Sequence, residues 1–223
     1  MRDYQRRFIE LALARLALKF GEFTLKSGRC SPYFFNAGLF NDGESIATLG
    51  ECYAQALLQA GLAFDMLFGP AYKGIPLVAA TAIALARGHA RNVPWAYNRK
   101  EAKDHGEAGI LIGSPLRGRV VIVDDVITAG TAIRESIELI RKAGAEPVAV
   151  SLALDRQERG SGDRSAVQEM TAQYGLTCVA ILTLDELIAA METPADRAAA
   201  SLTPVQMEAL RAYRHKYGAA DVP

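Results

Sequence analysis

The stretch "VVIVDDVITAGT", residues 120–131, decides the fold. Its apolar run is typical of a strand buried on both faces, and a small-residue turn leads from it into the helical pattern "TAIRESIELIRKAG". Two acids, Asp124 and Asp125, stand between strand and turn. Because adjacent carboxylates repel each other and a helix cap needs only one of them, we expect the second acid to serve a ligand.

The same alternation of strand and helix patterns extends from residue 44 almost to the end of the chain. It predicts an α/β fold with a mostly parallel twisted sheet and helices on both faces. Strands are expected at 65–70, 94–98, 119–125, 146–155 and 177–182, and helices at 44–61, 74–86, 131–144, 165–174, 184–191 and 203–218.

The amino-terminal part follows a different pattern. An amphipathic helix is expected to run from the start to Gly21, and residues 22–38 then predict an antiparallel hairpin around Ser27 and Gly28. Residues 99–118 form a polar stretch that we interpret as a mobile loop. Since no repeat or linker divides the chain, residues 1–223 are expected to form one domain.

Composition excludes several classes of function. The 25 Lys and Arg residues balance 25 Asp and Glu residues, so we expect no binding of nucleic acid or of an acidic membrane surface by bulk charge. No apolar stretch is long enough to span a bilayer, and the amino terminus lacks the pattern of a signal peptide. The three cysteines lack metal-ligand spacing, which indicates a reducing compartment, and we expect a cytoplasmic protein.

The turn after the two acids predicts a phosphate site. Free backbone N–H groups and the positive end of the following helix meet there. The chain contains no Walker A string, and a Rossmann fingerprint would place its acid after the glycines rather than before them. Acids at a strand end followed by a phosphate loop suit a sugar phosphate, with the carboxylates accepting hydrogen bonds from ribose hydroxyls.

Residues 120–131 resemble the signature with which type I phosphoribosyltransferases bind 5-phosphoribosyl 1-pyrophosphate (PRPP). Four more segments resemble the orotate phosphoribosyltransferases within that group: "FTLKSGRCSPYFFN" (23–36), "GPAYKGIP" (69–76), "NRKEAKDHGE" (98–107) and "LDRQERG" (154–160). The resemblance implies transfer of phosphoribosyl from PRPP to orotate, giving orotidine 5-phosphate and pyrophosphate in pyrimidine synthesis. A type I enzyme for another base, a PRPP-sensing regulator that binds nucleic acid and a structural assembly protein are the alternatives.

The resemblance also assigns residues. Asp124, Asp125, Lys103 and His105 are implied to be catalytic, although His105 is more simply a donor to phosphate. Residues 1–40 are implied to form a helix and a hood over the base, and Arg156 would pair the orotate carboxylate bidentately. The implied orotate site is Lys26, Phe34, Phe35, Thr128 and Arg156. The implied PRPP site is Lys26, Tyr72, Lys73, Arg99, Lys100, Lys103, His105, Asp124, Asp125, Val126, Ile127, Thr128, Ala129, Gly130, Thr131 and Ala132.

Three further properties are implied. Mg²⁺ is expected to arrive with the PRPP phosphates, so no protein residue is assigned as a metal ligand. A homodimer is expected in which part of the loop 99–118 serves the neighbouring subunit's site. An unusual peptide bond, of the costly cis type, is expected near Ala71 and Tyr72.

Overall fold

A six-stranded sheet forms the centre of the molecule, with the strand order β5-β4-β3-β6-β7-β8. All neighbouring strands are parallel except β4 and β5. The computed structural model describes residues 1–25, 28–103, 109–127, 130–160, 162–193, 196–197 and 200–220, and for residues 102, 103 and 109 the backbone alone. The strands are β3 Met66–Gly69, β4 Trp95–Lys103, β5 Gly109–Gly113, β6 Arg119–Asp124, β7 Glu146–Asp155 and β8 Thr177–Thr183.

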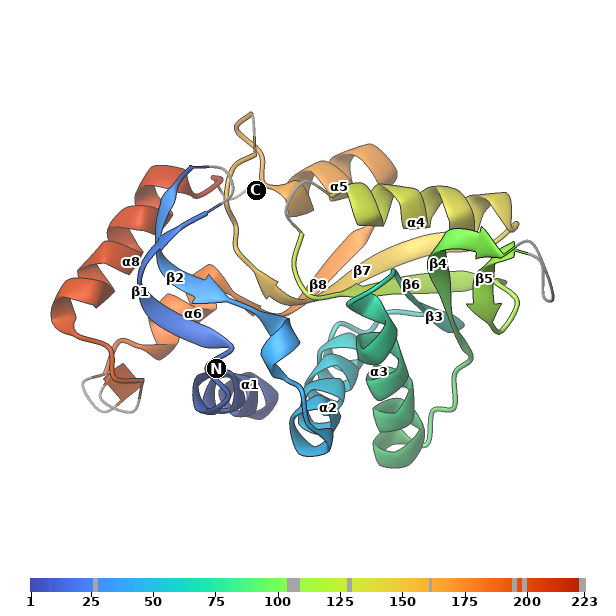
Figure 1. The fold of residues 1–223 in the computed structure, drawn as a ribbon, viewed down its shortest axis with the longest axis horizontal. Helices are drawn as coiled ribbons and strands as arrows, with labels where there is room; N and C mark the ends of the chain where they lie inside the picture. Colours follow the sequence, from blue (N-terminus) through green and yellow to red (C-terminus); the bar gives the residue numbers. More distant parts are fainter. Residues whose placement is uncertain are drawn as a thin grey trace.

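Helices cover both faces of this sheet, which confirms the predicted fold class (Figure 1). On one face lie α1 Asp3–Ala14, α2 Gly43–Gln59 and α3 Gly74–His89, and on the other α4 Thr131–Lys142 and α5 Ala166–Tyr174. Beyond β8 lie α6 Leu184–Ala190 and α8 Pro204–Tyr217. The predicted start of α8 is confirmed: Thr203 caps it, Pro204 is its first residue and Gln206 completes a capping box.

Strand β6 shows why the apolar run in residues 120–123 is continuous. Val121 and Val123 pack in the core layer that contains α1, α2 and α3. Val120 and Ile122 pack in the opposite layer with the isoleucines of α4. Because successive side chains of a strand point to opposite faces, a strand covered on both sides needs apolar residues at every position.

The amino-terminal hairpin forms as predicted, from β1 Leu18–Thr24 and β2 Cys30–Phe35, and the short 3-10 helix η1 Ala37–Leu39 follows it. The predicted end of the first helix at Gly21 is wrong, because α1 ends at Ala14. Leu16 takes a left-handed φ of 55° and is 59% exposed, so it leaves the helix rather than continuing its apolar face. Pairing of Leu18 with Phe35 prevails there over the local helical pattern.

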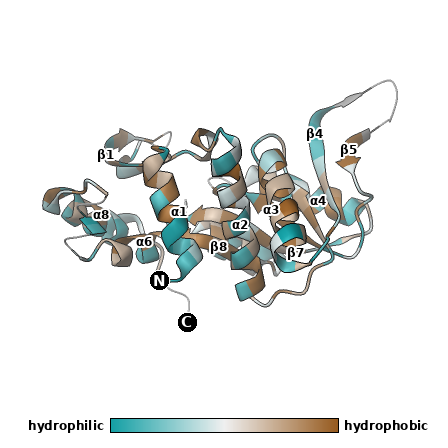
Figure 2. Cartoon of the chain, turned by 90° about the horizontal axis from the view of Figure 1, so that it is seen from below, coloured by the Kyte–Doolittle hydropathy of each residue, from teal (hydrophilic) through white to brown (hydrophobic). Residues whose placement is uncertain are grey.

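The polar stretch 99–118 also differs from its prediction as a loop. Strand β4 continues to Lys103, and β5 returns antiparallel to it with Tyr97 opposite Ile112. Figure 2 shows β4 and β5 projecting away from the body of the molecule. The mobility predicted for residues 99–118 stays a prediction, and residues 104–108 of this stretch lie outside the described residues. In the described ranges, no helix has both the length and the apolar character needed to cross a bilayer.

Candidate active site

The sheet changes direction between β3 and β6. From β3 the chain continues outward to β4, whereas from β6 it continues to β7 on the other side. The helices that follow, α3 and α4, accordingly lie on opposite faces (Figure 1). Such a switch point leaves a crevice beyond the carboxyl ends of the two strands, where ligands of open α/β sheets bind. The loop 70–73 and, after β6, the described residues 125–127 and 130 border this crevice.

The first of these loops is drawn close to β6 by a glycine. A Cβ atom on Gly74 would lie 2.9 Å from the carbonyl oxygen of Val123 and 2.8 Å from the carbonyl carbon of Gly69. Since real Cβ atoms do not approach backbone so closely, any other residue would push α3 away from the strand. Gly74 therefore lets the start of α3 lie beside the end of β6.

The two acids end β6 as buried groups. Asp124 is 9% exposed and Asp125 5% exposed. The Asp124 carboxylate accepts a hydrogen bond from the backbone N–H of Asp125 at 2.9 Å. The backbone carbonyl oxygen of Asp124 accepts one from the hydroxyl of Tyr53, on α2, at 2.7 Å. Burial, together with the charge of Asp125, raises the pKa of Asp124 to about 7. Asp124 is therefore held close to protonation in the free protein.

Lys73 joins the two loops. Its Nζ atom lies 2.6 Å from Oδ2 of Asp125, although the Lys73 side chain is 56% exposed and the Asp125 side chain only 7%. The carbonyl oxygen of Asp125 accepts a hydrogen bond from Ala153 of β7 at 2.9 Å. Cation, acids and β7 thus meet at one point of the sheet edge, and the resemblance assigns Lys73, Asp124 and Asp125 to the same PRPP site.

Two more cations, Arg99 and Lys100, lie on β4, beside the loop 70–73. Nζ of Lys100 is 5.2 Å from the ring centroid of Tyr72, which is 67% exposed. Asn98 accepts a hydrogen bond from the backbone N–H of Ala71 at 3.0 Å, and this contact ties the loop to β4. The Ala71–Tyr72 peptide bond is cis, as expected. Arg99 is half-buried in the same strand.

The turn from the acids to α4 has the expected form where it is described. Val126 and Ile127 are half-buried, and α4 begins at Thr131. Gly130 precedes that helix with a φ of 71°, the left-handed conformation that glycine adopts without strain. Ala132 lies in the first turn of the helix. The first backbone N–H groups of α4 are thus available at this edge for an anion.

Arg156 stands just past β7, at the same edge, and contacts a residue that sequence reasoning missed. Its Nε and Nη2 atoms donate to Oε1 of Glu158 at 2.9 and 2.6 Å, and Nε also lies 3.2 Å from the hydroxyl of Tyr33. Within the described ranges Nη1 makes no hydrogen bond. Tyr53 was missed as well, because its contact with Asp124 joins residues 71 positions apart.

The two phenylalanines of the hairpin do not act as a pair. Phe35 packs against Phe8 and Phe40, with ring centroids 6.0 and 6.3 Å apart. Phe34 points to the other face, is 42% exposed and lies 5.6 Å from Phe23. Alternation along a strand separates the two rings, while their backbone groups remain adjacent. The assignment of Phe34 and Phe35 to the orotate site stays a prediction.

Several assigned residues cannot be placed. Lys26, His105, Thr128 and Ala129 lie outside the described residues, and only the backbone of Lys103 is described, at the end of β4. Among the residues that are described, no three His, Cys, Asp or Glu side chains gather into a metal cage. The adjacent carboxylates of Asp124 and Asp125 fit an Mg²⁺ ion that takes its other ligands from phosphates and water.

Comparisons with known proteins agree with this geometry. Residues 39–176 match the phosphoribosyl transferase domain. The orotate phosphoribosyltransferase of Thioalkalivibrio sulfidiphilus is 62% identical over 98% of this chain and 100% of its own, and that of Cronobacter sakazakii is 59% identical over the same shares. The crystal structure of the Francisella tularensis orotate phosphoribosyltransferase superimposes with a TM-score of 0.84 at 41% identity, covering 95% of this chain and 99% of that one. With this identity over nearly its whole length, and with the acidic turn and Lys73 at the switch point, the chain belongs to the orotate phosphoribosyltransferase family.

Proposed function

We propose that the acidic turn and the cations around it carry out, in this chain, transfer of the 5-phosphoribosyl group from PRPP to orotate. The products are orotidine 5-phosphate and pyrophosphate, in pyrimidine biosynthesis. One observation carries the assignment of the reaction to this site: buried Asp124 and Asp125 meet Lys73 at the switch point of the sheet, 2.6 Å separating the lysine from Asp125. Carboxylates for the ribose and a cation for pyrophosphate thus face the same crevice.

The two acids would act on the sugar. As the bond from C1 to pyrophosphate breaks, the ribosyl ring becomes positively charged, and carboxylates fixed beneath it favour that state over the neutral ground state. Their positions are set before substrate arrives, because Tyr53 and the N–H of Asp125 hold the Asp124 backbone and side chain. The amides at Gly130 and Thr131 would hold the 5-phosphate.

The cations would act on the leaving group. Lys73 would exchange Asp125 for a pyrophosphate oxygen, and Lys100 and Arg99 lie on the neighbouring strand. We assign Lys103 and His105 to the same task, with His105 as a donor to phosphate. Bound Mg²⁺ would neutralise the pyrophosphate charge and help it leave. Asp124 and Asp125 are the protein groups that could hold this ion.

Orotate would be recognised at Arg156. Glu158 accepts hydrogen bonds from Nε and Nη2 along one edge of the guanidinium group. In the part of the chain that the structure describes, the other edge, formed by Nη1 and the second N–H of Nη2, is open. A carboxylate could pair there, which a purine base does not offer. Phe34, the backbone at Phe35, Lys26 and Thr128 complete the proposed base site.

A direct assay tests this assignment. Purified protein should consume orotate, followed by its ultraviolet absorbance, only when PRPP and Mg²⁺ are both present, and adenine or guanine should not replace orotate. Arg156→Ala should raise the KM for orotate by about 10²-fold or more, since a paired charge is lost, and leave the KM for PRPP nearly unchanged. Turnover of a purine in place of orotate would refute the assignment.

We also propose a homodimer in which the β4–β5 hairpin serves the partner's site. The hairpin projects from the body of its own subunit, which supports this reach (Figure 2). Lys103→Ala should lower turnover by roughly 10²–10³-fold if it acts like other preorganised charges. At an orotate concentration far below the KM expected for Arg156→Ala, both variants should be nearly inactive. Mixing Lys103→Ala and Arg156→Ala subunits should then restore about a quarter of wild-type activity, because half of the dimers are hybrids with one intact site. No recovery in a mixture that exchanges subunits would show that the hairpin serves its own site.

The proposed compartment is the cytoplasm. Cys30, Cys52 and Cys178 are all free thiols, which suits a reducing environment. Cell fractionation with an antibody to the chain would test this placement.

A further inference from the structure

Glu158 lies near the proposed orotate site and joins several elements, and it takes no part in the proposed reaction. Its side chain is only 15% exposed. Oε1 accepts hydrogen bonds from Arg156 at 2.9 and 2.6 Å and from the Tyr213 hydroxyl at 2.9 Å. Oε2 lies 3.8 Å from Nη1 of Arg29. One carboxylate thus joins the strand end after β7, the hairpin and α8.

The contacts leave a defined part of Arg156 open. Glu158 takes the Nε and Nη2 edge of the guanidinium, and the ring of Tyr33 lies 5.3 Å from Cζ. Burial raises the pKa of Tyr33 above its ordinary value, so its hydroxyl stays protonated beside the pair. The orientation of a planar guanidinium is fixed once one edge and one face are occupied. Arg156 therefore presents its remaining edge in a single direction.

The backbone around this pair is also fixed. Asp155 accepts a hydrogen bond from the N–H of Gln157 at 2.8 Å, and Gln157 adopts a left-handed φ of 52°, which is uncommon for a residue with a side chain. Across from it, Ala219 donates to the carbonyl oxygen of Gln157 at 2.8 Å and Arg159 donates to that of Tyr217 at 2.9 Å. The end of α8 therefore holds the segment that carries Arg156 and Glu158.

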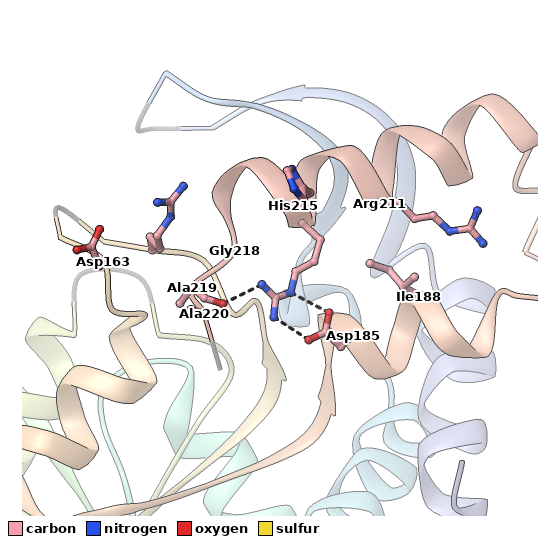
Figure 3. A pocket seen from close by; sticks show the side chains of 10 residues that line it. Asp163, Asp185, Ile188, Arg211, His215, Gly218, Ala219 and Ala220 are labelled. Atoms are coloured by element: carbon pink, nitrogen blue, oxygen red, sulfur yellow. Dashed lines mark hydrogen bonds and ion pairs between the residues drawn. The ribbon is translucent and has the colours of Figure 1, made fainter. Parts of the chain in front are cut away.

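The position of α8 is itself pinned. Arg214 forms a two-pronged ion pair with Asp185 of α6, at 2.8 and 2.7 Å, and donates to the carbonyl oxygen of Ala219 at 3.0 Å (Figure 3). These contacts line a cavity of about 660 Å³ that opens beside the end of α8. The bonds of Arg214 leave its charge neutralised, so we assign no ligand to the cavity. Tyr213 precedes Arg214 on α8, so the contacts of Arg214 also help to fix the position of Tyr213.

From these contacts we infer that Glu158 is a positioning residue for orotate recognition, which orients Arg156 toward the orotate carboxylate, and that α8 supports it through Tyr213. The inference rests on the proposed role of Arg156. It predicts that changes at Glu158 and Tyr213 act on orotate and not on PRPP, although neither side chain need touch the base. By this inference α8 also contributes to the specificity for orotate.

Two variants and a matched control test it in the full-length enzyme. Glu158→Gln keeps the shape of the side chain and one acceptor oxygen but loses the charge, so the KM for orotate should rise about 10-fold, with the KM for PRPP changing less than twofold. Tyr213→Phe removes one donor and should raise the KM for orotate about threefold. Tyr217→Phe removes a hydroxyl without a hydrogen bond in the described ranges, one turn further along α8, and should leave both constants unchanged.

The outcomes separate this inference from the proposed function. If Arg156→Ala raises the KM for orotate and Glu158→Gln and Tyr213→Phe do not, the inference alone fails. A lower KM for orotate in Glu158→Gln would show that Glu158 competes with orotate for Arg156, and would overturn it. A parallel rise in both KM values with a loss of thermal stability would show a merely structural role. If Arg156→Ala leaves the KM for orotate unchanged, the role of Arg156 and the inference fall together.

Discussion

The ammonium nitrogen of Lys73 lies 2.6 Å from a carboxylate oxygen of Asp125, so in the free protein the crevice is bridged by its own ion pair. The two residues come from loops after different strands, 52 positions apart in sequence. An exposed lysine and a buried acid share this contact, and the lysine is the partner with room to move. Substrate phosphate can therefore draw Lys73 away while Asp125 stays in place.

The first prediction concerns Lys73. Lys73→Gln should lower kcat/KM for PRPP by about 10²-fold, because a preorganised cation is lost from the leaving group. The KM for orotate should change much less. Steady-state kinetics with each substrate varied in turn measures both effects, and Lys142→Gln, an exposed lysine near the far end of α4, is the control. If kcat/KM for PRPP falls by less than threefold, Lys73 does not act on the leaving group.

The second prediction concerns stability and pH. Burial and the charge of Asp125 raise the pKa of Asp124 to about 7, so folding takes up a proton between about pH 4 and pH 7. The stabilisation that accompanies this is complete below the ordinary pKa and is lost as the pH rises through 7. Urea unfolding should therefore show the wild type losing on the order of 1–3 kcal/mol more than Asp124→Asn between pH 5 and pH 8. Equal pH dependence in both proteins would contradict the raised pKa.

The third prediction follows from the same proton. An Mg²⁺ ion held beside Asp124 would favour the ionised carboxylate. Binding of PRPP with Mg²⁺ should therefore release about half a proton per site at pH 7. Calorimetric titrations in buffers of different ionisation enthalpy count that proton. The release should disappear in Asp124→Asn. If both proteins release the same number of protons, the proton comes from another group.

Sequence reasoning located the site because its signal is local. The run before Asp124 has to be apolar at every position to fill both core layers, and the small residues after Asp125 have to turn into α4. Both demands are visible in twelve consecutive residues. The family resemblance then supplied Lys73. The strand order places β3 beside β6, but it does not by itself determine that Lys73 contacts Asp125.

What was missed depends on contacts between distant residues. Glu158 and Tyr213 are 55 positions apart in sequence, and Tyr53 and Asp124 are 71 apart. No local sequence pattern therefore predicts either contact. The end of α1 at Ala14 depends likewise on pairing between β1 and β2. The opposite orientation of Phe34 and Phe35 follows from the period of a strand, so this feature is predictable from the sequence alone.

The fourth prediction uses this separation. Phe35→Ala should cost about 2–4 kcal/mol of unfolding free energy, because its ring packs with Phe8 and Phe40 in the core. Phe34→Ala should cost less than about 1 kcal/mol, since Phe34 is 42% exposed, and should instead raise the KM for orotate. Denaturant unfolding and orotate kinetics on both variants measure the contrast. Equal stability losses would mean that both rings belong to the core.

The fifth prediction concerns Tyr53, which supports the acids from beneath. Its ring is fully buried, burial raises its pKa well above the ordinary value, and its hydroxyl donates to the carbonyl oxygen of Asp124 at 2.7 Å. Tyr53→Phe leaves that buried oxygen without its donor and should cost about 1–3 kcal/mol of unfolding free energy. Because the same carbonyl fixes the turn that carries both acids, kcat should fall several-fold at saturating PRPP and orotate.

Tyr4→Phe is the matched control for Tyr53→Phe, since Tyr4 packs on the same face of the sheet and its hydroxyl meets only the side chain of Arg2 in the described ranges, at 3.1 Å. Loss of that contact should change stability by less than about 0.5 kcal/mol and leave kcat unchanged. If Tyr53→Phe lowers stability but keeps full kcat, the hydroxyl serves the core alone. A fall in kcat with unchanged stability would instead mean that a water molecule replaces the donor without restoring the orientation of the acids.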